Sequence, residues 1–429
     1  MKNTFVISCP IDTYSGYGAR SRDIVKALIE LDKYEVKILP QRWGNTPWGF
    51  IEDNKEWHFL KPHLLPVGNQ LTEKPDIWAQ ITVPNEFTPI GEYNIGITAG
   101  IETDTCAPQW IEGMNRMDIN FVSSNHSKSV FENSKFEIKH QQTGQIQGML
   151  KLDKPIEVLF EGVDLNTYFQ DNSPCLIDFN IKESFAYLFV GHWLPGALGE
   201  DRKNVGLLVK AFLETFKNKK KKPALILKTS ISGPSYIDRD EVIKRISEIK
   251  NTVNSKNLPN IYLLHGDFTN EEMNSIYNHS KVKAMVNLTK GEGFGRPLLE
   301  FSLTSKPILS TNWSGHIDFL NSEFTTLLGG ELKPIHQSAQ VKDMLIEGSK
   351  WFSPNHSEIG SHLKGMFEDY KSYTDGGKRQ AYYSKTNFSF DKMKELLGDL
   401  LERNVPEIAK QVQLELPKLQ LPKLQKIDG

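Results

Sequence analysis

The sequence predicts an α/β protein made of two doubly wound sheets that face each other across a cleft. The chain has 429 residues, which is more than a single hydrophobic core usually holds. Short apolar runs alternate with helical patterns along it, as expected for buried parallel strands joined by helices. The alternation starts again after residues 165–183, where Asp171-Asn172-Ser173-Pro174 interrupts regular structure. We therefore expect two successive α/β units.

The expected strands form two series. The first unit opens with an apolar run at residues 4–8, followed by a small-residue stretch at Gly16 and a helical pattern that carries Ile24 and Leu28. The other strands of this unit are expected at residues 35–39, 77–83, 94–99, 119–123 and 156–160. The second unit repeats the alternation, with strands at 186–190, 224–229, 261–264, 283–288 and 307–310, and with helices at 205–216, 240–253 and 297–303.

The interruption divides the chain into a first domain at residues 1–170 and a second domain at 171–380. Residues 381–410 include an amphipathic helix, which is a candidate for crossing back to the first domain. In the tail, 411–429, the sequence Leu-Pro-Lys-Leu-Gln occurs twice in succession, and its prolines forbid a continuous helix. The tail is expected to be frayed and flexible, and the alternative is a docking segment for a partner.

Composition and charge exclude several classes of protein. With 38% hydrophobic and 24% charged residues, the chain has enough apolar material for real cores, which excludes disorder for most of its length. A net charge of −2 gives no overall positive field for nucleic acid or anionic lipid. Cys9, Cys106 and Cys175 form no CxxC pair and predict neither a disulfide framework nor a zinc site. Because no signal-peptide core or 18-residue apolar run is present, we expect a cytoplasmic protein without a membrane span.

The first glycine loop, Gly16-Tyr17-Gly18-Ala19-Arg20-Ser21, follows a strand and opens a helix. It is similar to the GxGxxG fingerprint of dinucleotide-binding proteins, with Ser21 at the third glycine position. That fingerprint needs an acidic residue at the end of the second strand, but this strand runs into Leu39-Pro40-Gln41-Arg42. A nicotinamide-dependent enzyme is therefore disfavoured. Gly16 and Gly18 either let a phosphate or sugar approach the backbone, or form only a tight turn.

The most informative stretch runs from Lys290 to Glu300 and places glycines at 291, 293 and 295 between a strand and a helix. Pro297 suits the first helical turn. Unshielded backbone N–H groups at such a helix start can balance the charge of a diphosphate without a metal ion. Glu292 and Glu300 are expected to point into one cleft, one toward sugar hydroxyls and the other toward a ribose. The plainer alternative is a glycine-rich loop followed by a glutamate in a first helical turn.

This stretch resembles the E-x7-E motif of the family 4 (group 1) retaining glycosyltransferases, which have the GT-B fold. Other segments follow in the family's order, so the resemblance covers residues 1–405. It implies two Rossmann-like domains, with the donor mainly on the second and the acceptor on the first. The implied reaction moves a sugar from a nucleotide-diphosphate sugar to an acceptor hydroxyl with retention of configuration. Neither a tightly bound cofactor nor a metal ion is implied.

The resemblance also implies a donor site. Phe189-Val190-Gly191 and then Asp201-Arg202-Lys203-Asn204 are similar to the family's strand and basic pair. Arg202 and Lys203 would therefore bind the diphosphate and, with Glu292, form the catalytic set, because cations stabilise the departing nucleoside diphosphate. The remaining donor-binding residues are the loop Gly293-Phe294-Gly295, Glu300 for the ribose, His192 where many members have arginine, and Gly16 and Gly18 from the first domain.

The acceptor side is less well marked. Gly100-Ile101-Glu102-Thr103-Asp104, followed by Trp110, resembles the family's acceptor-side loop. A histidine that family members often carry near this point, in contact with the donor sugar, is missing here. Glu102 or Asp104 is a candidate replacement, and the alternative is that both only cap local structure. In the further matching block 312–316, His316 is either structural or a donor contact.

Other patterns favour different functions but are given less weight. Asp238-Arg239-Asp240 has the DxD form of metal-dependent glycosyltransferases, yet it precedes a helical pattern and is interpreted as a helix start. The basic run at 219–222 and the tryptophans 43, 48 and 57 lie in different domains, so they predict no common nucleic-acid groove. We expect the tryptophans on the acceptor side. Two alternatives stay open: a glycosyltransferase whose acceptor is a modified DNA base, and a non-catalytic GT-B-like protein that binds a nucleotide or glycan.

Overall fold

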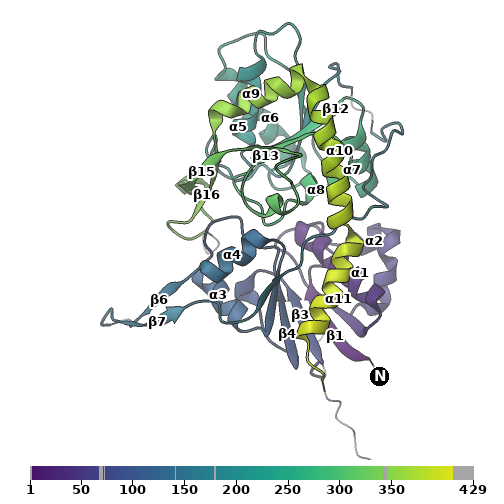
Figure 1. The fold of residues 1–429 in the computed structure, drawn as a ribbon, viewed down its shortest axis with the longest axis vertical. Coiled ribbons are helices and arrows are strands. Elements are labelled where there is room, and N and C mark those ends of the chain that lie inside the picture. Colours follow the sequence, from purple (N-terminus) through teal and green to yellow (C-terminus); the bar gives the residue numbers. More distant parts are fainter. Residues whose placement is uncertain are drawn as a thin grey trace, which may run out of the picture.

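The computed structural model describes residues 2–408, apart from 67–70, 72, 141, 178–179 and 342–344. The chain forms two α/β units, which lie one above the other in Figure 1. The tail expected at 411–429, with its repeated Leu-Pro-Lys-Leu-Gln sequence, lies outside the described residues.

The first unit contains a six-stranded sheet in the order β2-β1-β3-β4-β5-β8, and every neighbouring pair of strands is parallel. Its strands are β1 (Asn3–Cys9), β2 (Tyr34–Pro40), β3 (Ile77–Ile81), β4 (Tyr93–Ile97), β5 (Ile119–Val122) and β8 (Ile156–Val158). All six lie where the sequence predicts strands. Their side chains are largely buried on both faces, because β-branched residues such as Ile7 and Ile95 pack under helices on either side.

The second unit contains another parallel six-stranded sheet, in the order β11-β10-β9-β12-β13-β14. Its strands are β9 (Ala186–Val190), β10 (Ala224–Lys228), β11 (Ile261–Leu264), β12 (Val282–Asn287), β13 (Ile308–Thr311) and β14 (Thr326–Leu328). Five of them were expected, whereas the short edge strand β14 was not. The prediction of two doubly wound α/β sheets is confirmed.

Separate apolar clusters flank each sheet. On the first sheet, α1 (Gly16–Leu31) and α11 (Phe390–Asn404) pack on one face, and α3 (Pro108–Asn115) and α4 (Asn125–Asn133) on the other. On the second sheet, α5 (Val205–Phe216), α6 (Tyr236–Asn251) and α9 (His356–Glu368) cover one face, and α7 (Asn270–Asn278) and α8 (Arg296–Ser302) the other.

The last two helices connect the units. Helix α10 (Tyr370–Asn387) packs against α8 and α9 of the second unit. It leads into α11, whose Phe390, Met393 and Leu397 enter the apolar cluster of the first sheet beside α1. Figure 1 shows the two helices one after the other along the same side of the molecule. The chain thus returns to its first unit, and the domain boundary expected at residue 380 falls within α10.

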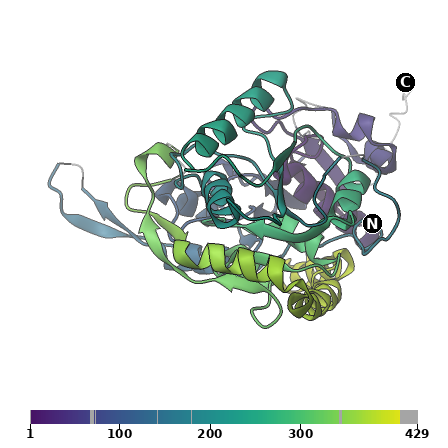
Figure 2. The ribbon, with the colours of Figure 1, turned by 90° about the horizontal axis from the view of Figure 1, so that it is seen from above.

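Two antiparallel hairpins were not predicted from the sequence. The strands β6 (Phe136–Lys139) and β7 (Ile146–Leu150) form one, which projects from the first unit in Figures 1 and 2. The strands β15 (Gly330–Pro334) and β16 (Lys350–Pro354) form the other. The backbone N–H of Phe352 in β16 donates to the carbonyl of Lys290, so this second hairpin supports the start of the glycine-rich loop.

Candidate functional site

The glycine-rich loop lies at the carboxyl edge of the second sheet, between β12 and α8. Its last residue, Gly295, has a φ of +100° and begins the helix, a conformation that glycine adopts without strain. Pro297 follows in the first turn, as expected. The side chain of Phe294 is only 2% exposed and packs beside Phe319. The packing of Phe294 therefore anchors the loop in the apolar core of the second unit, at the edge where α/β sheets bind ligands.

A buried ion pair occupies the centre of this loop. The Lys203 ammonium donates to both carboxylate oxygens of Glu292, at 2.6 and 2.7 Å. The two side chains are 14% and 6% exposed. Burial by itself would raise the pKa of Glu292, but Lys203 and Arg202 together lower it to about 2. Glu292 is thus held as a carboxylate, and Lys203, from the loop before α5, is held beside it.

This ion pair predicts an acid-sensitive contribution to stability. Because the pKa of Glu292 is lower in the folded chain than its usual value of 4.5, the pair stabilises the fold fully above about pH 4.5. That contribution, about 3 kcal/mol for a shift of this size, is lost as pH falls toward 2. Denaturant unfolding of wild type and Glu292→Gln should therefore differ most near pH 6 and converge in acid. A difference independent of pH would contradict the assignment.

Arg202 links the loop to the first unit. Its guanidinium donates to the carbonyl of Gly291 at 2.8 Å and lies 3.2 Å from the Glu102 carboxylate and 3.7 Å from that of Glu292. Of the two acidic residues expected on the acceptor side, Glu102 therefore joins the cluster. Asp104 does not join it, because its carboxylate accepts a hydrogen bond from the backbone N–H of Lys350 at the start of β16.

Two loop glycines are required by packing between the units. A Cβ atom at Gly291 would lie 2.0 Å from the carbonyl oxygen of Glu102, and one at Gly293 would lie 2.2 Å from that of Ala99. The Ser123 hydroxyl hydrogen-bonds to the carbonyl oxygens of both Ala99 and Gly293. The sequence predicts that these glycines face a phosphate, whereas in the structure the nearest atoms to them are backbone oxygens of the first unit.

Replacing Gly293 by alanine is expected to lower the free energy of unfolding by about 1–3 kcal/mol, because the neighbouring atom is rigid backbone. The matched control is Gly16→Ala. Nothing lies within 4 Å of a Cβ atom there, so that variant should keep or slightly gain stability. Urea unfolding of both variants measures the difference. Equal losses of unfolding free energy would show that the close contact at Gly293 does not cause the destabilisation.

Glu300 belongs to a second buried ionic cluster, which joins the units. Its carboxylate accepts from the Tyr277 hydroxyl at 3.0 Å and from Arg296 Nε at 3.1 Å. Arg296 also binds Asp23 of α1 at 2.5 Å and lies 3.9 Å from Glu161. Burial raises the pKa of Glu300, although Arg296 and Tyr277 act against it. The two glutamates of the motif are therefore held by different cations.

The first glycine loop divides into a packed and an open residue. A Cβ atom at Gly18 would lie 2.3 Å from the carbonyl oxygen of Thr13, so this glycine is explained by the tight turn into α1. Gly16 is exposed and has open space above it. Beside it, Tyr17 stacks on Trp43 with a ring-centroid distance of 3.9 Å, and its hydroxyl accepts from the Ala99 backbone at 3.2 Å. The aromatic side chains therefore approach the strand end that contacts Gly293.

His192 is exposed beyond the end of β9, where its Nδ1 lies 3.1 Å from the Ser230 hydroxyl.

Asp238 of the DxD sequence is buried in the first turn of α6 and accepts hydrogen bonds from the backbone N–H groups of Ile231 and Ser232. It also binds His265 at 2.8 Å. These contacts leave Asp238 as a helix-start residue that orders its own loop.

Comparisons with known proteins identify the fold. Neither a family profile nor a curated protein matches the sequence. Sucrose-phosphate synthase of Thermosynechococcus elongatus superposes with a TM-score of 0.59 at 11% identity, over 94% of this chain and 99% of its own. A glycosyltransferase of Rickettsia africae ESF-5 gives 0.60 at 14% identity, over 95% and 100%. HepE of Anabaena, solved with UDP and glucose, gives 0.55 at 11% identity, over 94% and 100%. The chain has the GT-B fold.

Two histidines near the interface between the two units of this GT-B fold have a buried ring nitrogen without a hydrogen-bond partner among the described residues. His316 is fully buried, and its Nε2 lies 2.7 Å from the carbonyl of Thr311, which leaves Nδ1 unpaired. His126 of α4 packs edge-on against Trp313, and its Nε2 is unpaired. Burial lowers both pKa values, that of His126 to about 4, so both rings are neutral near pH 7.

From the sequence, His316 was either structural or a donor contact, and His126 was not predicted. The position of His126 in the first turn of α4 gives no signal in the sequence. An unpaired buried nitrogen costs about 1–3 kcal/mol, and a neutral imidazole nitrogen accepts hydrogen bonds. Each ring therefore has a nitrogen that can accept a hydrogen bond from a hydroxyl group near the interface between the two units.

Within the described ranges, no group of three or more His, Cys, Asp or Glu side chains is arranged to hold a metal ion. The three cysteines are free thiols. None of the helices in the described part of the chain combines the length and apolar character that a membrane crossing requires.

Proposed function

We propose that this protein is a retaining glycosyltransferase that moves a sugar from a nucleotide-diphosphate sugar to an acceptor hydroxyl. The observation that carries the proposal is the buried Lys203–Glu292 pair with Arg202 beside it. These charges lie at the carboxyl edge of the second sheet and face the first unit of a GT-B fold. A site that binds only a glycan has no need for two cations held so close to a carboxylate.

The cations suit a departing nucleoside diphosphate. An ammonium group has three N–H donors, and Lys203 uses two for Glu292, so a third can reach a phosphate oxygen. The outer N–H groups of Arg202 and the amides of Gly293, Phe294 and Gly295 complete the diphosphate site, with His192 at its rim. This positive charge stabilises the leaving group as the glycosidic bond to phosphate breaks, and no metal ion is needed for it.

Glu292 orients the transferred sugar and Glu300 the ribose. In the reaction the acceptor oxygen bonds to the anomeric carbon, the bond from that carbon to the diphosphate breaks, and the acceptor proton passes to the leaving phosphate. Retention places the new bond on the face that the diphosphate leaves. Rate enhancement then comes from positioning and charge stabilisation rather than from a pair of acid and base carboxylates.

The acceptor is proposed to bind the first domain, residues 1–170, and the donor the second, residues 171–380. Gly16 is the open position of the first loop, and Tyr17 and Trp43 supply ring faces on which a sugar can stack. Glu102 contacts Arg202 from this side, and the neutral nitrogens of His126 and His316 are acceptors for donor hydroxyls. The free cysteines fit a reducing cytoplasm.

A panel of nucleotide sugars tests the proposal, with UDP-sugars first because HepE was solved with UDP. Thermal shift should reveal a stabilising donor, and release of nucleoside diphosphate should follow when acceptor sugars are added. A nucleotide that binds without any turnover would favour a non-catalytic binding protein. Product analysis by NMR tests the stereochemistry separately, since an inverted anomeric centre would refute retention.

A further inference from the structure

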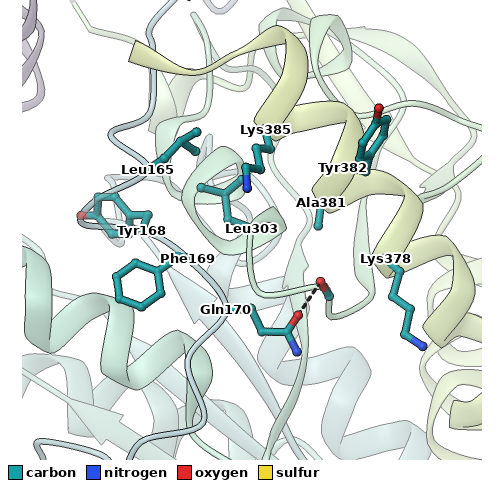
Figure 3. Close-up of a pocket in the computed structure, with 10 residues that line it drawn as sticks. Leu165, Tyr168, Phe169, Gln170, Leu303, Lys378, Ala381, Tyr382 and Lys385 are labelled. Atoms are coloured by element: carbon teal, nitrogen blue, oxygen red, sulfur yellow. Dashed lines mark hydrogen bonds between the residues drawn. The ribbon is translucent and has the colours of Figure 1, made fainter. Parts of the chain in front are cut away.

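A cavity of about 400 Å³ lies where the two units are joined, and none of the glycine-rich loop residues lines it. One wall is the connection between the units, residues 165–170. The others are the turn after α8, at residues 303 and 305, and one face of α10 (Figure 3). We call this cavity the junction pocket.

The junction pocket combines apolar walls with unpaired positive charge. Leu165, Phe169 and Leu303 supply the apolar surface, and Phe169 is still 44% exposed. Lys378 and Lys385 lie seven residues apart on α10 and so share a face. Neither ammonium has a partner among the described residues, and no acidic side chain lines the cavity. Figure 3 shows Lys385 extending from α10 toward Leu303.

A small organic anion with a flat ring matches this lining. Aromatic and aliphatic walls favour a ring by burial of apolar surface, and two lysines at the rim favour a carboxylate, sulfonate or phosphate group. Tyr382 lies between them on α10 and is 75% exposed, and Figure 3 shows its hydroxyl directed away from Leu303 and Phe169. We propose that the junction pocket is a second ligand site, which takes a ring-bearing organic anion.

The pocket is connected to the donor side through Tyr168. This tyrosine lines the cavity, and its ring packs beside Tyr277, whose hydroxyl donates to Glu300. Burial and the nearby Glu300 carboxylate raise the pKa of Tyr168 well above its usual value. The turn after α8 is tied to the same wall, since the Ser305 hydroxyl donates to the Gln170 side chain at 3.0 Å.

Ser305 also has a φ of +62°, in the left-handed region that favours glycine, so this turn stores backbone strain. A ligand against Tyr168 and this turn therefore acts on the end of the helix that carries Glu300. Occupancy of the junction pocket changes nucleotide affinity through that contact, a consequence that rests on the proposed function.

The aromatic sulfonate 8-anilinonaphthalene-1-sulfonate is a suitable probe, used with the full chain and followed by fluorescence. The double variant Lys378→Gln/Lys385→Gln should weaken its Kd at least tenfold. The charge-matched control Lys220→Gln/Lys371→Gln changes two exposed lysines outside the pocket and should leave Kd within twofold. All four side chains are exposed, so both variants should keep the wild-type melting temperature. Equal effects of the two variants would refute the site.

A second titration, with UDP present, tests the coupling. Binding to separate, coupled sites changes the probe Kd by a factor that levels off as UDP saturates. If the apparent Kd of the probe instead keeps rising in proportion to the UDP concentration, the probe and UDP compete for the donor site. That result would refute the proposal. If UDP has no effect while the lysine variants still weaken the probe, the pocket stands and the nucleotide coupling fails. Failure of the proposed function is thus distinguishable from failure of the pocket.

Discussion

Alanine at position 203 is expected to lower donor turnover by about 10²–10³-fold, the usual cost of removing one stabilising donor at a site of developing charge. Lys203 supplies two hydrogen bonds to Glu292, and its loss leaves a buried carboxylate with only the more distant Arg202. Breaking a buried pair in this way costs about 3–5 kcal/mol of folding stability. Turnover measured per folded molecule, at a temperature below the melting transition, separates the two effects.

Lys210→Ala is the matched control for Lys203→Ala. Lys210 lies on α5, a short distance along the chain, and pairs with Glu214 at 3.3 Å at a more exposed position. A partly exposed pair of this kind contributes about 1 kcal/mol or less, and turnover should be unchanged. If Lys203→Ala behaved like Lys210→Ala, the buried pair would have no part in donor chemistry.

Arg296→Leu is expected to destabilise the fold by about 3–5 kcal/mol and to weaken donor binding. Arg296 holds Asp23, Glu161 and Glu300 together across the two units. Removing it takes away the cation that the three largely buried carboxylates share. Arg20 still lies near Glu161 and Asp23. Glu300, however, loses its cation, so the remaining negative charges are poorly compensated. Glu300 is also released from its position, so the loss of affinity should appear in the KM for the donor.

The Arg296→Leu defect should shrink as pH falls. Carboxylates without a cation have raised pKa values and take up protons on acidification, which relieves their repulsion. Chemical unfolding at pH 7.5 and pH 5 measures this. Arg379→Leu is the control, because Arg379 lies 3.8 Å from Glu323 at an exposed position. A loss at Arg296 no greater than at Arg379, or one that grows in acid, would contradict the role of the ionic cluster.

Most of the fold could be predicted because its strands are buried on both faces. Runs such as 186–190 and 224–227 are continuous and apolar, and short runs of this kind between helical patterns are typical of buried parallel strands. The parts that were missed lack this signal. Strand β14 has three residues at an edge, and β15 is exposed along its whole length. Pairing between neighbouring backbones, rather than burial, forms these strands.

The candidate site was predictable where the chemistry is local in the sequence. The pattern from Lys290 to Glu300 placed two carboxylates and three glycines near one helix start, and the structure brings Arg202 and Lys203 to Glu292. Contacts between the units were not predictable. Three features depend on how the two units pack: Ala99 lies close to Gly293, Asp104 accepts a hydrogen bond from β16, and His126 is buried. No periodicity in the chain encodes that packing.

The central claim is that Arg202, Lys203 and Glu292 form the binding site of a nucleoside diphosphate. Calorimetric titration of UDP and the other nucleoside diphosphates into wild type, Lys203→Ala and Lys210→Ala tests it most directly. We predict that at least one nucleotide binds wild type and Lys210→Ala with the same Kd, and binds Lys203→Ala at least tenfold more weakly. Equal binding to all three proteins, or no binding of any nucleoside diphosphate to wild type, would contradict the claim.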